Sequence, residues 1–87
     1  MLGEANIKDV KIKIGEWCKQ KRRMYELSQD DLAQALEMSR LTIRKLEDGK
    51  NVTLDTLLKV VSHFDMLEVV YNAIDNNISD SNINSLY

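Results

Sequence analysis

Apolar positions near the middle of the chain recur with the period of an α-helix in two short runs. Leu32, Ala33 and Leu36 lie at i, i+1 and i+4, which places them on one face of a first helix. The apolar face is interrupted after Leu36, and Ile43 and Leu46 then form the inward face of a second helix. The pattern predicts two short helices joined by a tight corner.

Polar residues at the ends of these two runs are typical helix caps. Ser28 can cap the first helix, and Asp30 and Asp31 then fall in its first turn, where the helix dipole favours negative charge. Ser39 can cap the second helix, and Gly49 follows its end, a common position for glycine. Each of the two helices therefore has a beginning and an end in the sequence.

Residues 7–24 predict a longer helix before this pair. Its inward stripe, at spacings close to three and four residues, is formed by Ile7, Val10, Ile14, Trp17, Cys18 and Met24. We interpret Trp17 as an anchor in the core rather than a ligand platform. Cys18, on the same stripe, is interpreted as an inert buried thiol rather than a nucleophile.

Two more helices follow. Thr53 can cap a helix that closes the core with Leu54, Leu57, Leu58, Val61 and Phe64. Residues 66–74 predict a last helix, whose core face would be Met66, Val70, Ala73 and Ile74. The polar residues 76–87 are expected to be a flexible tail, or a segment that orders against a partner, and residues 1–6 a flexible leader. The expected fold is all-α, with one five-helix domain over residues 7–75.

Composition excludes several classes of protein. The chain has 87 residues, of which 44% are hydrophobic and 30% charged, with no proline, as expected for one small helical domain. Its single cysteine cannot form an internal disulfide, and it contains no long apolar run, so we expect a soluble cytoplasmic protein. The acidic cluster of Glu26, Asp30 and Asp31 is explained by helix-dipole complementarity. No catalytic or metal-binding spacing occurs, so we expect no enzyme, no metal and no cofactor.

Charge is divided unevenly along the chain. Residues 1–50 carry a net charge of +2 and residues 51–87 a net charge of −4. The basic residues before the helix pair are interpreted mainly as a solvated face: Lys8, Lys11, Lys13, Lys19, Lys21 and Arg23. The second helix of the pair carries Arg40, Leu41, Arg44 and Lys45 on its outward face. A short helix that is apolar inside and basic outside is typical of one that enters the major groove of DNA.

Residues 28–50 resemble the Cro/cI-type (XRE) helix-turn-helix family of bacterial and phage regulators, and the resemblance extends from Arg22 to about Phe64. The matching residues are Gln29, the pair Leu32-Ala33, Ser39, the pair Thr42-Ile43, and Leu46-Glu47 followed by Gly49-Lys50. The chain departs from the family at Glu26 and Glu37, where glycine is usual. A non-glycine residue at positive φ costs about 1 kcal/mol, which does not exclude the motif.

The resemblance implies a lambda-repressor-like domain of bacterial or phage origin. It further implies a sequence-specific DNA-binding transcriptional regulator, a repressor, that recognises the major groove with residues 39–48. The implied base contacts are Ser39, Arg40, Leu41, Arg44 and Lys45, and the implied phosphate contacts are Gln29, Lys50 and Asn51. By the same resemblance, Arg22 and Glu47 would form a largely buried ion pair between the first helix and the recognition helix.

The last predicted helix carries more apolar residues than one core stripe can hide. Leu67, Val69 and Tyr71 are in excess, and we expect them to form a homodimer interface, to which Ile78, Ile83 and Leu86 could add. An alternative is an antitoxin that binds a toxin protein and also regulates its own operon. The sequence determines neither the operator nor an effector.

Overall fold

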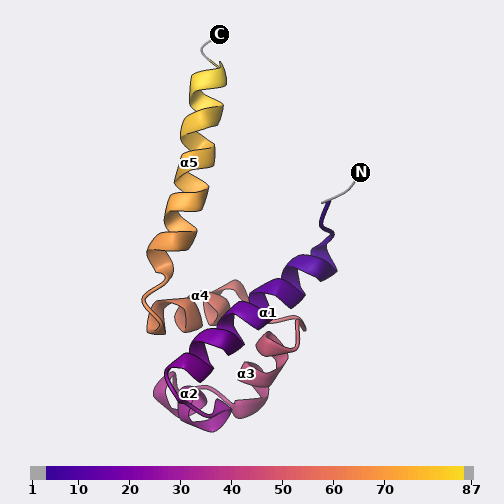
Figure 1. The fold of residues 1–87 in the computed structure, drawn as a ribbon, viewed down its shortest axis with the longest axis vertical. Coiled ribbons are helices and arrows are strands. Elements are labelled where there is room, and N and C mark those ends of the chain that lie inside the picture. Colours follow the sequence, from indigo (N-terminus) through magenta and orange to yellow (C-terminus); the bar gives the residue numbers. More distant parts are fainter. Residues whose placement is uncertain (1–3, 86–87) are drawn as a thin grey trace.

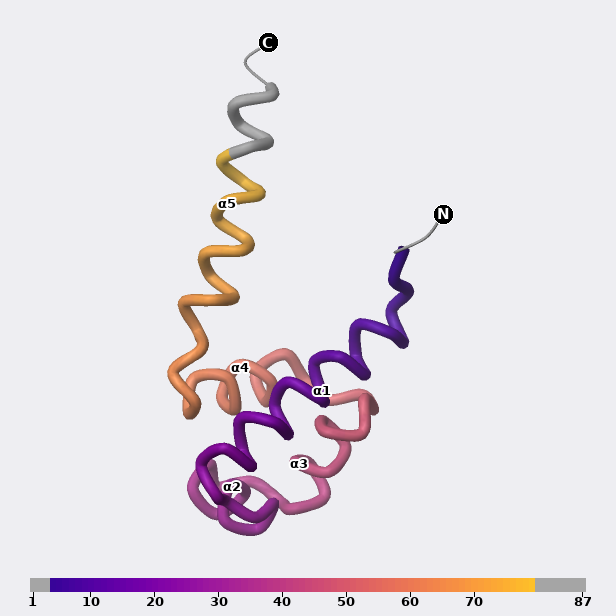
Figure 2. The backbone as a smooth tube through the Cα atoms, in the orientation of Figure 1, coloured from indigo at the N-terminus to yellow at the C-terminus, as the bar shows by residue number. Residues whose placement is uncertain are grey.

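The computed structural model describes the backbone of residues 4–85 and the side chains of residues 4–79. Five α-helices and no strands occur in this part of the chain, so the predicted all-α fold is confirmed. Helices α1 to α4 gather into one body, from which α5 and the beginning of α1 project (Figure 1, Figure 2). The helices are α1 (Ile7–Met24), α2 (Gln29–Ala35), α3 (Arg40–Glu47), α4 (Leu54–His63) and α5 (Leu67–Ser85).

Each of the first four helices begins at a side-chain cap. Ser28, Ser39 and Thr53 accept a hydrogen bond from the backbone N–H three residues ahead, as the sequence predicts. The Asp31 carboxylate accepts a hydrogen bond from the backbone N–H of Ser28, which completes a capping box and lowers the pKa of the Asp31 carboxyl. Asn6 caps α1 in the same way with Asp9. These local hydrogen bonds explain why the helix starts were predictable from sequence.

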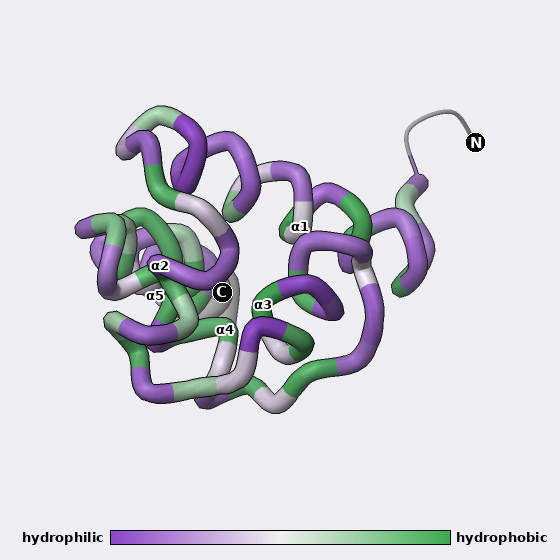
Figure 3. The backbone as a smooth tube through the Cα atoms, turned by 90° about the horizontal axis from the view of Figure 1, so that it is seen from below, coloured by the Kyte–Doolittle hydropathy of each residue, from purple (hydrophilic) through white to green (hydrophobic). Residues whose placement is uncertain are grey.

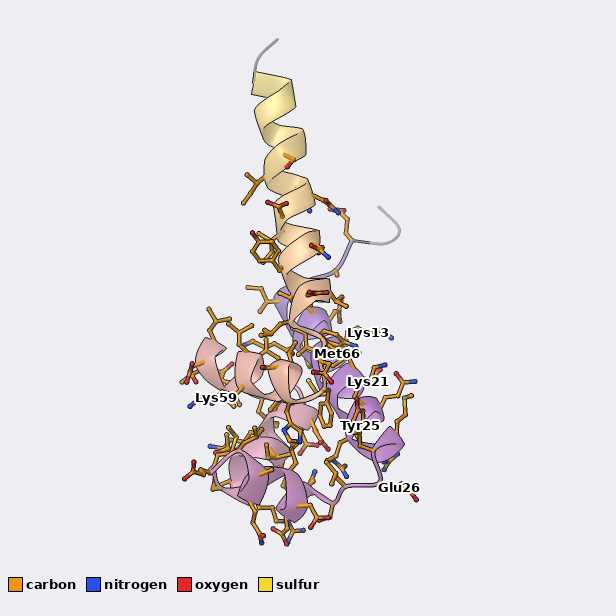
Figure 4. All side chains as sticks on the ribbon, turned by 90° about the vertical axis from the view of Figure 1, so that its left-hand side faces the viewer. Lys13, Lys21, Tyr25, Glu26, Lys59 and Met66 are labelled. Atoms are coloured by element: carbon orange, nitrogen blue, oxygen red, sulfur yellow. The ribbon has the colours of Figure 1, made fainter. Side chains whose placement is uncertain are left out.

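One backbone motif ends all four of these helices. The residue after the C-cap is left-handed, at Glu26 (φ 57°), Glu37 (φ 54°), Gly49 (φ 74°) and Asp65 (φ 57°). The next N–H bonds back to a carbonyl five residues earlier, as in the bond from Leu27 N to Arg22 O at 3.1 Å. Glu26 and Glu37 thus adopt the conformation for which the family uses glycine. Figure 4 shows Glu26 at the corner after α1.

The core lies where α1, α2, α3 and α4 meet. Its buried hydrophobic residues are Cys18, Leu32, Ala33, Ile43, Leu46, Val60, Val61, Phe64 and Met66. Tyr25 packs its ring 5.1 Å from that of Phe64 and joins the end of α1 to the end of α4. Trp17 is half-buried against this core.

Burial raises the pKa of the Cys18 thiol to about 11, with a smaller contribution from Glu47, so the thiol is protonated at neutral pH. Hydrophobic and hydrophilic stretches alternate along the chain in Figure 3.

Four residues of α1 and α4 that were predicted to face the core do not face it. Ile7 and Val10 are 75% and 46% exposed, because the first turns of α1 extend beyond the body and meet no other helix. Met24 is 65% exposed and Leu54 is 70% exposed, each at the end of its helix. The periodicity was helical as predicted, but no neighbouring element covers these positions.

The last helix is longer than predicted and makes less contact with the body. It continues to Ser85, so the predicted end of this helix at Ile74 is wrong. Neither glycine nor proline interrupts residues 67–85, and asparagine and serine are weak helix formers rather than helix breakers. Ala73 and Ile74, predicted to face the core, are exposed because α5 has left the body by then.

Candidate nucleic-acid interface

Helix α3 is divided into a buried face and an exposed face. Ile43 is 0% exposed and Leu46 is 3% exposed, and both pack into the core between α1 and α2. On the other face Leu41 is 55% exposed, although it is apolar. The residues exposed with it are Arg40, Arg44 and Lys45. Four of the five side chains that the resemblance assigns to base contact, Arg40, Leu41, Arg44 and Lys45, are therefore accessible on α3.

Helix α1 crosses the C-terminal end of α3 at Gly15. A Cβ atom at Gly15 would lie 2.5 Å from the carbonyl oxygen of Glu47 and 2.7 Å from that of Leu46. Only glycine permits so close an approach to another backbone. No local pattern predicted this contact, although a glycine inside a strongly periodic helix is a signal for a close approach.

The same end of α3 is held by a buried ion pair. Arg22 donates from Nε to Glu47 Oε2 at 2.6 Å and from Nη2 to Glu47 Oε1 at 2.9 Å. The two side chains are only 9% and 2% exposed. A third hydrogen bond, from Arg22 Nη1 to the carbonyl oxygen of Leu27 at 2.7 Å, ties in the α1–α2 corner. The hydrogen bonds with Glu47 raise the pKa of the Arg22 guanidinium, so the guanidinium stays charged.

Gln29 joins this network from the first turn of α2. Its Nε2 donates to Glu47 Oε1 at 3.0 Å, and the side chain is half-buried. A carboxamide carries two N–H donors, so one donor remains for a phosphate oxygen. Gln29 thus lies between the core network and the surface, whereas the sequence assigned it only to phosphate contact.

The N-terminal end of α3 is organised by weaker contacts. The Ser39 hydroxyl caps the helix by accepting from Thr42 N at 3.1 Å, and it lies 2.8 Å from Thr42 Oγ1. Arg40 Nε lies 3.9 Å from Asp30 Oδ1, and the two side chains are 63% and 60% exposed. The Ser39 hydroxyl is therefore engaged by the cap, while Arg40 is accessible to a ligand.

The segment after α3 adds further donors to the exposed face. Lys50 and Asn51 line one shallow hollow together with Leu41, Arg44, Lys45 and Asp48. Lys11, from α1, donates a hydrogen bond to Asn51 Oδ1. The structure thus brings Lys11 from a distant helix to the predicted phosphate contacts, whereas its sequence position indicated only a solvated face. Asp48 and Asp30 are the acidic side chains at this surface.

The residues predicted to form the dimer interface do not share one face of α5. Leu67 and Tyr71, one turn apart, are 43% and 69% exposed. Val69 is 60% exposed, but at about 100° per residue it lies on nearly the opposite side. The stripe of Leu67 and Tyr71 continues instead through Ile74 (56% exposed) and Ile78 (53% exposed). We call Leu67, Tyr71, Ile74 and Ile78 the α5 seam. The Ile83 side chain and Leu86 lie outside the described residues.

Comparison with known proteins agrees with this geometry. A family model described as helix-turn-helix, of the XRE type, matches residues 19–71, which include α2, α3 and α4 completely. A search of curated proteins found no match. Within the part of the chain that the structure describes, no helix is long and apolar enough to span a membrane. The match covers more than half of the chain, and we conclude that the protein belongs to the XRE-type helix-turn-helix family of DNA-binding transcription regulators.

Proposed function

We propose that the protein is a sequence-specific transcriptional repressor that recognises the DNA major groove with residues 39–48. The exposed Leu41 supports this most directly. A leucine that is 55% exposed on a short helix, between accessible arginine and lysine side chains, suits contact with the methyl group of thymine. Arg40 can donate to both O6 and N7 of guanine, and Arg44 and Lys45 can contact bases or phosphates nearby. Ser39 contributes by capping the helix that presents them.

Phosphate contacts would fix the orientation of α3 in the groove. Lys50 and Asn51 follow α3, and Gln29 begins α2, so the two sets flank the base-contacting face. We add Lys11 to this set because its hydrogen bond to Asn51 holds the ammonium group beside the same surface. Such contacts strengthen binding to all sequences alike. Lys50→Ala is therefore expected to weaken specific and non-specific binding equally.

Binding-site selection tests the base contacts. Wild type should select one operator sequence, and the Arg40→Ala/Leu41→Ala double variant should lose the preference for the bases under these side chains. Lys59→Ala is a matched control, because Lys59 is exposed on α4 and pairs with Asp55 at 3.1 Å, away from α3. The same selected motif for wild type and the double variant would refute the assignment.

A dimer is part of the proposal. One recognition helix contacts only a few base pairs, so two copies on half-sites about 34 Å apart would supply the missing specificity. The α5 seam is a solvent-exposed apolar stripe on a helix that projects from the body, and a second copy can cover it. Sedimentation at micromolar concentration should show a dimer that Tyr71→Asp dissociates, with loss of operator affinity and unchanged helicity. The same result with Val69→Asp would contradict the assignment of the interface to the seam.

Repression is tested with the selected operator placed over a promoter. The protein should lower transcription from the wild-type operator and not from one altered at the bases under Arg40. The antitoxin alternative is favoured by the same exposed seam, since a toxin could cover it instead of a second copy. Co-purification of the product of an adjacent reading frame, lost in Tyr71→Asp, would support that alternative.

A further inference from the structure

Two helical arms project from the body, and each carries an apolar seam. The first arm is the N-terminal half of α1, and the second is α5; in Figures 1 and 2 they diverge on the same side of the body. The α1 seam is formed by Ile7, Val10, Ile14 and Trp17, at spacings of three, four and three residues. The α5 seam has spacings of four, three and four. Alternating spacings of three and four are typical of helices that pack along their length.

The two seams match in length. At about 1.5 Å per residue, residues 7–17 span about 15 Å and residues 67–78 about 16 Å. Each seam is continuous with the core at its base, through Trp17 and Ile14 on α1 and through the half-buried Val70 beside the α5 seam. The α1 seam becomes more exposed away from the body, to 75% at Ile7, and the four side chains of the α5 seam are between 43% and 69% exposed. The two arms thus extend the hydrophobic core outward as two uncovered surfaces of similar size.

The charges of the two arms are opposite. Helix α1 as a whole contains seven Lys and Arg residues and two acidic ones, a net charge of +5, of which Arg22 is neutralised by buried Glu47. Residues 7–17, which carry the seam, have three lysines and two acidic residues, a net charge of +1. Helix α5 contains three acidic residues and no basic one, a net charge of −3. Two α5 helices packed together would place two like-charged helices side by side. An α5 helix packed on α1 would instead place a negative helix against a positive one.

Charged residues also flank the seams in suitable positions. Glu68 and Asp75 are exposed and seven residues apart, which places them on one side of the α5 seam. Lys13 borders the α1 seam, Lys21 continues the line of the seam four residues after Trp17, and Figure 4 shows both lysines along α1. Lys13 is 82% exposed and has a weak contact of 3.6 Å with Glu16. Lys13 is therefore fully accessible to a carboxylate of another helix, and the half-buried Lys21 is partly accessible.

The α5 of the same chain is not in a position to cover α1. The corner at Asp65 and Met66 is fixed by hydrogen bonds from their N–H groups to Ser62 O and Val61 O, at 3.0 Å each. Met66 is also buried in the core. This corner directs α5 away from α1 (Figure 1). An α5 helix that covers the α1 seam must therefore belong to another molecule.

We propose that α5 of a second copy packs on the α1 seam, with Glu68 and Asp75 facing Lys13 and Lys21. The contact is reciprocal about a twofold axis, so α1 and α5 of both copies form a four-helix arrangement. This inference rests on the dimer of the proposed function and specifies its architecture. Helix α1 holds α3 through Gly15 and through Arg22–Glu47, so a partner that docks on α1 sets the separation of the two recognition helices.

Neutralising the acids of α5 distinguishes this architecture from an α5–α5 dimer. Sedimentation equilibrium would compare full-length wild type with Glu68→Gln/Asp75→Asn. Loss of two charge contacts per copy is expected to raise the dimer dissociation constant by about tenfold, and added salt should weaken the wild-type dimer. An α5–α5 dimer would respond with the opposite sign, because neutralisation removes repulsion. Asp55→Asn, which neutralises one carboxylate on α4, is the control and should leave the dissociation constant unchanged.

A charge exchange provides a second test. Lys13→Glu/Lys21→Glu should weaken the dimer, and Glu68→Lys/Asp75→Lys in the same chain should restore it, with helicity checked by circular dichroism throughout. A dimer that neutralisation strengthens or leaves unchanged, or that the lysine reversal does not affect, overturns this inference and leaves the proposed dimer intact. A wild-type monomer at all concentrations overturns both. Operator selection with Arg40→Ala/Leu41→Ala remains an independent test of DNA recognition.

Discussion

The two ends of α3 differ in what holds them. At the C-terminal end Glu47 is 8% exposed, and its carboxylate accepts two hydrogen bonds from Arg22 and one from Gln29. At the N-terminal end Arg40 forms a weak ion pair with Asp30. Arg40 Nε lies 3.9 Å from Asp30 Oδ1, and both side chains are more than half exposed. One helix thus combines a rigidly held end with an end whose side chains remain accessible.

The difference separates stability from recognition. A buried pair that loses one partner leaves an uncompensated charge in the core, which is costly. An exposed pair contributes about 0–1 kcal/mol, because water and salt screen it. We therefore expect substitutions at the C-terminal end of α3 to change folding, and substitutions at the N-terminal end to change DNA binding with little effect on folding.

The largest effect is expected from Glu47→Gln. The neutral side chain leaves the Arg22 guanidinium buried without a counter-charge, so the free energy of unfolding should fall by about 3–5 kcal/mol. Thermal and denaturant melts measure this. Replacing both partners, as in Arg22→Met/Glu47→Leu, should cost much less than Glu47→Gln alone. A melting temperature unchanged within error in Glu47→Gln would show that the pair contributes nothing.

Gly15→Ala should also act at the held end of α3. The new methyl group would overlap the carbonyl oxygens of Leu46 and Glu47, and backbone atoms must move to accommodate it. We expect a loss of about 1–3 kcal/mol, despite the higher helix propensity of alanine, measured by denaturant unfolding. Gln20→Ala, at an exposed position of the same helix, is the control. Equal or greater stability in Gly15→Ala would mean that the crossing is looser than described.

Arg40→Ala should act at the accessible end. Loss of its hydrogen bonds to guanine is expected to cost about 1–3 kcal/mol of operator binding and to relax the preference at one base pair. The free energy of unfolding should stay within about 0.5 kcal/mol of wild type. Fluorescence anisotropy on operator and altered-operator duplexes, together with a melt, measures both. A large loss of stability would break the proposed division between the two ends.

Asp30→Asn should have the smallest effect. It removes a weak partner of Arg40 and a negative charge near the DNA-binding face, so operator affinity should rise by less than about 1 kcal/mol. Titrations at two salt concentrations show whether the gain is electrostatic, in which case it diminishes at the higher salt. Weaker operator binding in Asp30→Asn would instead show that Asp30 orients Arg40.

The sequence predicted the features that depend on near neighbours along the chain. The caps at Ser28, Ser39 and Thr53 bond to backbone three residues away, and the bounds of α1 follow from an uninterrupted helical period. The outward position of Leu41 followed in the same way, because Ile43 and Leu46 define the opposite face. The left-handed corners at Glu26 and Glu37 were found by resemblance to a pattern with glycine there.

Tertiary structure decided whether a helical face is covered. Ile7 and Ile74 lie on apolar stripes of correct period, yet they are 75% and 56% exposed, because periodicity does not show where a neighbouring helix ends. The approach of Gly15 to α3 and the hydrogen bond from Gln29 to Glu47 join residues far apart in sequence, which no local pattern encodes. Residues 76–85 are weak helix formers without a break, so local propensity left their conformation open. Local hydrogen bonding thus determines where helices begin and end, and long-range packing determines which of their faces remain available for binding.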